Sequence, residues 1–196
     1  MNRREIIKRM AAVVGGTLLG ADHILARGID WDTLAERPPG AGVGLFGKRQ
    51  VRLLNEIAET ILPETGTPGA KAARVGQFIA LIVSDCYEDA DQKVFSDGLA
   101  ALDTQCRKQY GKSFLRCTPA QRTELLGQLD AEQKAYYKTN RAGDPPHYFR
   151  MMKDLTLWGY FTSEIGATQA LQSVEIPGRY EGCVPHSIGD RAWGEF

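Results

Sequence analysis

The residues of this chain that could hold a metal ion or act as nucleophiles are few and widely spaced. His147 and His186 lie far apart, and neither has a set of cysteine or carboxylate ligands near it in the sequence. We interpret His147 as a helix-start residue and His186 as a tail residue, rather than as metal ligands. The cysteines show no C-x-x-C spacing, which argues against a zinc site and against covalently attached haem. They are Cys86, Cys106, Cys117 and Cys183.

Neither the carboxylates nor any cofactor motif provides a stronger candidate for a functional site. Glu56, Glu59 and Glu64 lie near one another, but the opposite face of their helix is apolar, so the simplest interpretation is a solvated side. No G-x-G-x-x-G run follows a strand, so we do not expect a flavin to bind here through a dinucleotide fingerprint. The sequence therefore predicts no catalytic, cofactor-binding or metal-binding residue in this chain.

The first 26 residues have the order of an export signal. Four basic residues precede an uncharged, weakly apolar run over residues 10–21. Two arginines, one further residue, two isoleucines and a lysine resemble the twin-arginine pattern, whose route carries folded cargo. The residues that carry this pattern are Arg3, Arg4, Ile6, Ile7 and Lys8.

Other interpretations of this segment fit less well. An amphipathic helix would show polar residues at every third or fourth position, whereas the only polar residue among residues 10–21 is one threonine. A membrane span is disfavoured because twelve residues at ~1.5 Å each cover roughly 18 Å of a hydrocarbon core about 30 Å thick. No clear cleavage site follows the apolar run, so both cleavage and retention of the signal stay open.

Charge and length restrict the class of the remaining chain. Lys and Arg number 24 and Asp and Glu number 24, and several of the positive charges belong to the signal. The rest is therefore mildly acidic, which argues against a nucleic-acid partner. Its length suits one domain with its own core.

An all-α domain of about six helices is predicted over residues 48–174. Apolar residues recur every three or four positions over residues 48–62, 75–86 and 89–110, as in helices that bury one face. The run Thr118-Pro-Ala-Gln121 is a capping box that starts another helix, with apolar residues as far as Leu129. A strongly apolar helix is expected from His147 to about Thr162, and no alternating strand pattern occurs.

Two irregular segments flank this domain, an N-terminal arm at residues 27–47 and a C-terminal tail at residues 175–196. Both are rich in glycine and proline, yet both contain large apolar side chains that are costly to leave in water. We predict that they contact a partner protein, with folding back over the chain's own helices as the alternative. The predicted partner contacts are Trp31, Phe46, Tyr180, Trp193 and Phe196.

In an oxidising compartment one disulfide is expected, and Cys106 with Cys117 is the preferred pair. Cys106 lies late in one predicted helix and Cys117 just before the next, so a short loop separates them. Bridging it would restrict the unfolded chain by about 3 kcal/mol. Four cysteines allow three pairings, and the other two stay open.

Several motifs, in order, resemble the gluconate 2-dehydrogenase subunit 3 family. They are Leu54-Asn-Glu-Ile-Ala-Glu-Thr-Ile-Leu-Pro63, Thr67-Pro-Gly-Ala70, Phe114, Thr118-Pro-Ala-Gln121, Leu157-Trp-Gly-Tyr-Phe-Thr-Ser-Glu164, Pro177-Gly and Gly182-Cys183. The resemblance extends from about Lys48 to Trp193. It implies the small, non-catalytic subunit of a bacterial sugar or sugar-acid dehydrogenase associated with the membrane.

The same resemblance implies partners and a location. The expected partner is a large FAD-binding subunit of the glucose-methanol-choline type, often joined by a multi-haem cytochrome c subunit. In such complexes the small subunit's twin arginines can carry the folded flavin subunit into the periplasm. A free-standing exported helical enzyme or binding protein is the alternative, and a pocket with convergent titratable groups would favour it.

Overall fold

A computed structural model describes residues 42–141 and 143–172, together with residues 176, 178, 182–183, 185 and 187–194 of the C-terminal segment. Within these residues the chain forms helices and two isolated β-bridges but no strand, so the all-α prediction is confirmed. The helices are α3 (Lys48–Ile61), α4 (Val75–Cys86), α5 (Asp89–Tyr110), the 3-10 turn η1 (Phe114–Arg116), α6 (Pro119–Thr139), α7 (Tyr148–Phe161) and the π turn η2 (Gly166–Ala170). None of these helices is long and apolar enough to cross a membrane.

Local signals in the sequence set the helix ends. Gly111 ends α5 in the left-handed region, at φ 69°, and its amide donates to the carbonyl of Arg107. The predicted capping box of α6 is present, because the Thr118 hydroxyl accepts from the Gln121 amide at 3.3 Å. In return, the Gln121 side chain accepts from the Thr118 amide at 3.0 Å.

Helix α6 is longer than its apolar stripe predicts. The stripe ends at Leu129, whereas the helix continues through a polar stretch to Thr139. Asp130 stabilises this extension, because it forms ion pairs with Lys134 one turn later and with Lys153 of α7, both at 2.6 Å. The polar stretch is therefore helical because of tertiary contacts as well as local ones.

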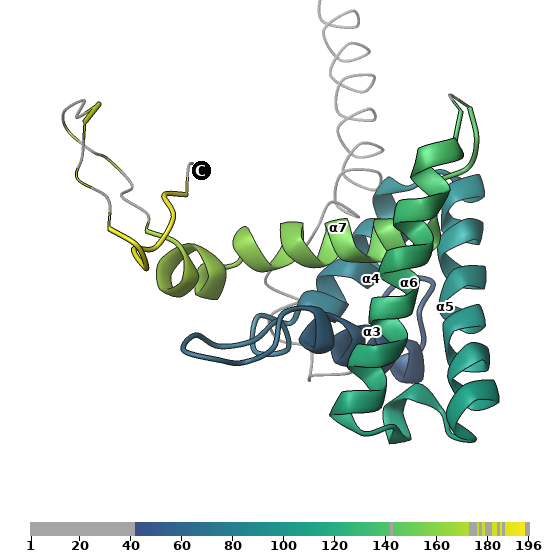
Figure 1. The fold of residues 1–196 in the computed structure, drawn as a ribbon. Coiled ribbons are helices and arrows are strands. Elements are labelled where there is room, and N and C mark those ends of the chain that lie inside the picture. Colours follow the sequence, from purple (N-terminus) through teal and green to yellow (C-terminus); the bar gives the residue numbers. More distant parts are fainter. Residues whose placement is uncertain are drawn as a thin grey trace, which may run out of the picture. The chain divides into compact units, whose positions relative to one another are not determined.

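Helix α4 lies at the centre of the domain and is buried on almost every side. Its main neighbours are α3 and α7, and α7 crosses the bundle in contact with α3, α5 and α6 as well (Figure 1). The close approach of α3 and α4 depends on Gly76, whose amide donates to the buried Asn55 side chain at 3.1 Å. A side chain at Gly76 would meet the backbone of α3.

The last residues of the predicted arm belong to the helical domain. Val43 and Phe46 exchange two backbone hydrogen bonds of 2.8 and 2.9 Å around a turn, and both side chains are buried. The Phe46 side chain is only 2% exposed and packs edge-to-face on Phe95. The prediction that Phe46 contacts a partner is therefore wrong, because a buried ring has no surface left to offer. The domain thus begins at Val43 or earlier, at least five residues before the predicted start at residue 48.

The described part of the tail returns to η2, the turn beyond α7 (Figure 1). Gln172 and Trp193 form a parallel bridge, in which the Gln172 amide donates to Ala192 at 2.8 Å and the Gly194 amide donates to Gln172 at 3.0 Å. The Arg191 guanidinium also donates to carbonyls of η2. Trp193 stays 55% exposed, so its ring adds little to this attachment.

A pair of glycine substitutions tests the contact between α3 and α4. In Gly76→Ala the new Cβ would lie 2.5 Å from the Asn55 backbone nitrogen, so we expect a loss of about 2 kcal/mol in stability. Gly127→Ala is the matched control, since nothing lies within 4 Å of that position in α6. It should raise stability by about 0.5–1 kcal/mol through helix propensity. Urea denaturation measures both, and equal effects of the two changes would contradict the close contact.

The pH dependence of stability tests the role of Asp130. Hydrogen bonds from Lys134 and Lys153 lower its pKa from 3.8 to about 2. Because the pKa is lower in the folded state, this stabilisation is present above about pH 4 and is lost as the pH falls towards 2. Asp130→Asn should lower the thermal midpoint by roughly 2–4 °C near neutral pH, and the two curves should converge near pH 2.

Asp97→Asn provides the control for this comparison. Within the described residues Asp97 pairs with Lys93 alone, one turn away on the exposed surface, so its loss should change the midpoint by less than a degree or so. A constant difference between wild type and Asp130→Asn from neutral pH to pH 2 would contradict the assignment.

Candidate functional site

Glu56 and Glu59 of α3 hold neighbouring segments, so the interpretation of Glu56, Glu59 and Glu64 as a solvated side is wrong for the first two. The Glu59 carboxylate accepts from the Glu64 amide at 3.1 Å and the Lys71 amide at 2.7 Å. The loop after α3, residues 62–74, is thereby tied back to that helix. On the other side of this loop, the Tyr160 hydroxyl of α7 donates to the Pro68 carbonyl at 2.6 Å. The motif residues of this loop thus have a structural role.

Glu56 joins three segments through ion pairs. Its carboxylate contacts Lys71 of the loop and, at 2.5 Å, Arg122 of α6. Arg122 also donates to the carbonyls of Phe114 and Leu115 in η1. Burial raises the pKa of Glu56, but the hydrogen bonds and charges of Lys71 and Arg122 outweigh it, so the net pKa is lowered. Glu56 is therefore a charged structural residue and not a proton donor at neutral pH.

Asp103 of α5 organises a basic hollow beside this network. One of its oxygens accepts from the Phe114 amide at 2.9 Å, which fixes the loop after α5. The other accepts from Arg107 at 2.9 Å and from Arg49 of α3 at 3.4 Å. One carboxylate therefore holds two guanidinium groups from different helices at the edge of the same hollow.

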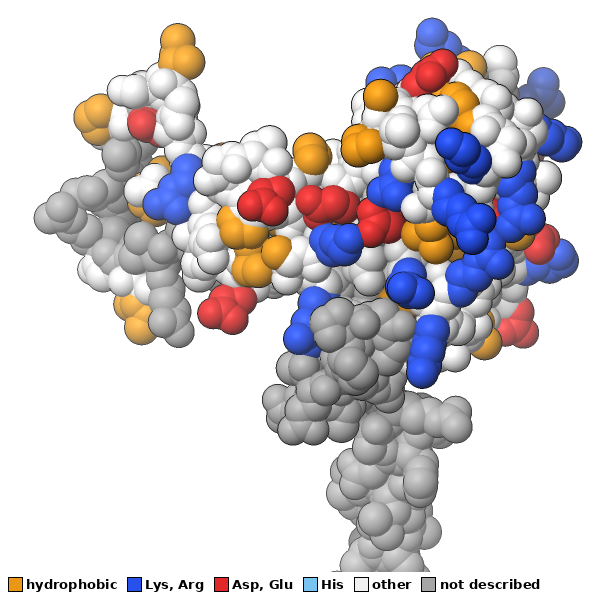
Figure 2. Space-filling model, turned by 90° about the horizontal axis from the view of Figure 1, so that it is seen from below, with side chains coloured by type: hydrophobic (Ala, Val, Ile, Leu, Met, Phe, Trp, Pro, Cys, Tyr) orange, Lys and Arg blue, Asp and Glu red, His pale blue; other side chains and the backbone are white. Residues whose placement is uncertain are grey.

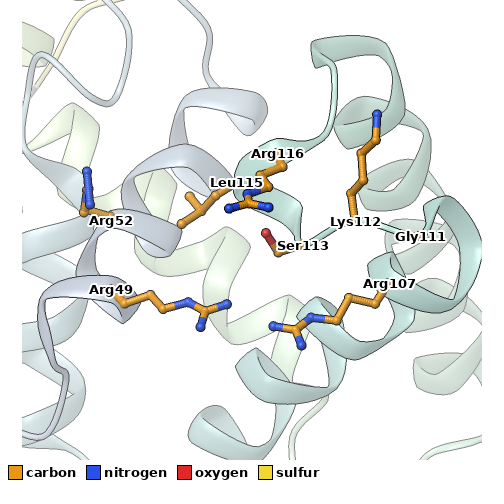
Figure 3. A pocket seen from close by; sticks show the side chains of 8 residues that line it. All are labelled: Arg49, Arg52, Arg107, Gly111, Lys112, Ser113, Leu115 and Arg116. Carbon is orange, nitrogen blue, oxygen red and sulfur yellow. The ribbon is translucent and has the colours of Figure 1, made fainter.

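The basic hollow has a volume of about 600 Å³ and is surrounded by cations of three segments. Arg49 and Arg52 come from α3, Arg107 comes from α5, and Lys112 and Arg116 come from the loop that follows. Figure 3 shows the guanidinium groups of Arg49 and Arg107 pointing towards each other, with that of Arg116 turned towards the same space. The Ser113 hydroxyl lies between them, and Arg52 and Lys112 stand at the rim.

The charge of this site is unbalanced although the whole chain is neutral. In the described part of the chain, the only ion pairs of the five cations are those of Arg49 and Arg107 with Asp103. Arg52, Lys112 and Arg116 are exposed and have no ion pair there. Figure 2 shows Lys and Arg side chains gathered over the bundle on the face seen from below. Guanidinium groups bind carboxylates and phosphates through paired hydrogen bonds, so this arrangement can attract and orient an anionic group.

A glycine run before α3 has the spacing of a dinucleotide motif, but its geometry does not fit FAD. The run is Gly42-x-Gly44-x-x-Gly47, and α3 follows it directly. A phosphate cradle needs backbone amides that point freely at the ligand. Here the amides of residues 43 and 46 bond each other's carbonyls, that of Leu45 bonds the Ser84 hydroxyl, and that of Gly47 bonds the Gln50 side chain. Gly44 instead lets the turn lie directly on Ser84.

Cys106 and Cys117 lie side by side in the core. Their Sγ atoms are 3.1 Å apart, and one thiol donates a hydrogen bond to the other. Both are free thiols in this structure, so the disulfide stays a prediction. Burial, followed by the contact with Cys117, raises the pKa of Cys106 to about 12. Cys86 and Cys183 are exposed.

His147 begins α7, as its sequence position predicts. Its Nδ1 accepts from the Phe149 amide at 3.2 Å, which caps the helix, and its ring stacks on Tyr148. Its Nε2 lies 3.8 Å from a carboxylate oxygen of Glu132. Among the described residues, no group of three or more His, Cys, Asp and Glu side chains is arranged to hold a metal ion.

The aromatic residues of α7 differ in exposure. Tyr160 is buried, whereas Trp158 is 52% exposed and packs edge-to-face on Phe78. Trp193 of the tail is exposed as well, so a partner contact there stays a prediction. The remaining predicted residues lie outside the described part of the chain: Arg3, Arg4, Ile6, Ile7, Lys8, Trp31, Tyr180, His186 and Phe196.

The fold and its surface define a small helical domain with an anion-attracting face. A family model described as gluconate 2-dehydrogenase subunit 3 matches residues 48–178, more than half of the chain. The chain therefore belongs to the gluconate 2-dehydrogenase subunit 3 family. Comparison with curated proteins and with solved structures gave no match.

Thiol reactivity tests the arrangement of the cysteines. In the native, reduced chain a maleimide should label Cys86 and Cys183 quickly, and Cys106 and Cys117 roughly 100-fold more slowly, because the reagent does not reach buried thiols. At Cys106 the raised pKa slows labelling further. After refolding under oxidising conditions, peptide mapping without reduction should find Cys106 linked to Cys117. Two free thiols at these positions, or a bond to Cys86 or Cys183, would contradict the predicted pairing.

Proposed function

We propose that this chain is the non-catalytic small subunit of an exported, FAD-dependent sugar or sugar-acid dehydrogenase complex. It stabilises a large flavin subunit of the glucose-methanol-choline type and escorts that subunit through the twin-arginine route into the periplasm. The FAD belongs to that partner, and a multi-haem cytochrome c subunit joins the complex as electron acceptor. Membrane association is then indirect, through the complex.

The family match carries this proposal. The matched family is named as a subunit of gluconate 2-dehydrogenase, and the match extends over residues 48–178, which include every described helix from α3 to η2. A subunit family implies an assembly of several chains. The assembly supplies the partner that the exposed surfaces of the domain would contact.

The structure supports a structural role for this chain. Groups with shifted pKa values are the usual candidates for acid, base or nucleophile. Here Glu56 and Asp130 are engaged in ion pairs that join helices, and Cys106 is buried against Cys117. Each of these pKa shifts therefore has a structural cause. The unbalanced charge of the basic hollow is suited to attracting an anionic group rather than to transferring a proton.

The export signal supports the escort role. A flavin subunit that binds FAD in the cytoplasm must cross the membrane folded, and the twin-arginine route carries folded cargo. The Arg3-Arg4 pair of this chain fits the signal of that route. One signal on the small subunit then suffices for both chains if they assemble first.

Replacement of Arg3 and Arg4 by lysine tests the escort role in cells that express the whole complex. The change keeps the positive charge but removes the twin-arginine signal, so periplasmic dehydrogenase activity should fall at least about tenfold while cytoplasmic activity rises. Arg9→Lys, outside the pattern, is the matched control and should leave export unchanged. Undiminished periplasmic activity in the Arg3→Lys, Arg4→Lys variant would contradict the proposal.

A further inference from the structure

The basic hollow is the feature of the domain that its own stability does not explain. Asp103 already satisfies Arg49 and Arg107 and also fixes the loop after α5. The additional cations at Arg52, Lys112 and Arg116 repel that pair and one another, and they receive no ion pair from the described residues in return. Such a concentration of like charge costs stability unless an anionic partner binds there.

We propose that the basic hollow, formed by α3, the end of α5 and the loop to α6, is the docking site for an acidic segment of the flavin subunit. Aspartate and glutamate side chains of that segment would bind Arg49, Arg107 and Arg116 and displace water from the hollow. This assignment rests on the proposed function, because it needs the flavin subunit as the partner.

The exposure of the cations favours a protein surface over a small anionic ligand. The side chains of Arg49 and Arg107 are 67% and 54% exposed although they share Asp103. A site for a small molecule normally buries most of its ligand among apolar side chains with a few fixed polar groups. Here long, solvated cations surround an open hollow with Leu115 and Ser113 in its wall. Arginine is enriched at protein interfaces, where it combines charge with apolar contact area.

Electrostatic attraction of this kind acts mainly on the rate of association. Charges at the rim of an interface steer the encounter, so their removal slows binding and weakens its dependence on salt. Screening reduces the same attraction, because the Debye length falls from about 10 Å at 0.1 M salt to about 3 Å at 1 M. A docking site on this face therefore predicts a specific kinetic signature.

Charge reversal of two arginines from different segments of the hollow that form no ion pair in the described part is the sharpest test. Arg52 and Arg116 are exposed and have no ion pair in the described part, so Arg52→Glu with Arg116→Glu should leave the fold intact. Lys138→Glu with Arg141→Glu is the matched control. Those residues are exposed at the other end of α6, which is roughly 30 Å long.

The full chain is expressed with a flavin subunit of the glucose-methanol-choline type from the same genome, and association of the purified subunits is measured at low and high salt. We expect R52E/R116E to reduce the association rate at least about tenfold at low salt, with little change in dissociation. The control variant should bind like wild type. Wild-type binding should weaken with salt more steeply than that of R52E/R116E. Circular dichroism and thermal midpoints confirm that both variants are folded.

The outcomes separate this inference from the proposed function. Wild-type chain that does not bind the flavin subunit overturns the proposed function and this assignment with it. Wild-type chain that binds while R52E/R116E binds equally fast overturns the assignment alone. Calorimetry with inorganic phosphate and with gluconate covers a small-anion site. Saturable binding of either anion that is abolished in R52E/R116E, with complex formation unchanged, would overturn the assignment in favour of such a site.

Discussion

The packing of α3 against α4 is the constraint on which the rest of the domain depends. Helix α4 is buried on almost every side, so α3, α5 and α7 must fit around it. Gly76 brings its backbone against α3, and the buried Asn55 side chain satisfies the Gly76 amide there. A buried polar side chain is favourable only where its partner is held in place, so this bond fixes the register of the two helices. Helix α7 then lies across both, in contact with four helices.

Partly buried carboxylates connect the elements around this core. Glu56 joins α3 to α6 and to the loop after α3, Asp103 joins α5 to α3 and to η1, and Asp130 joins α6 to α7. Each accepts bonds from more than one partner, which makes the geometry more specific than a single surface ion pair would. One of these connections also shapes the basic hollow, since Asp103 sets the positions of two of its arginines.

The sequence predicts the helices well where an apolar stripe or a cap defines them. The stripe of residues 48–62 and the capping box at Thr118 both appear in the structure. The buried hairpin of Val43 and Phe46 is missed because its glycines resemble a linker, although the two side chains complete the core. The end of α6 is missed because Asp130 gains its partner from a helix that is distant in sequence. The basic hollow is missed for the same reason, because only the fold brings Arg49 and Arg116 together. The equal numbers of positive and negative residues in the whole chain also give no sign of a local cluster of cations.

The burial of Cys106 and Cys117 makes their oxidation state a record of where the chain folds. Both thiols lie in the core, with at most 5% of either residue exposed, so an oxidant or an oxidoreductase reaches them only before folding or during local opening. A chain that folds in a reducing cytoplasm would arrive outside with both thiols still reduced. A chain that folds after translocation would meet oxidising conditions while the two sulfurs are still accessible. The fraction of linked molecules in a natural preparation would thus report the order of folding and export, without any measurement during transport itself.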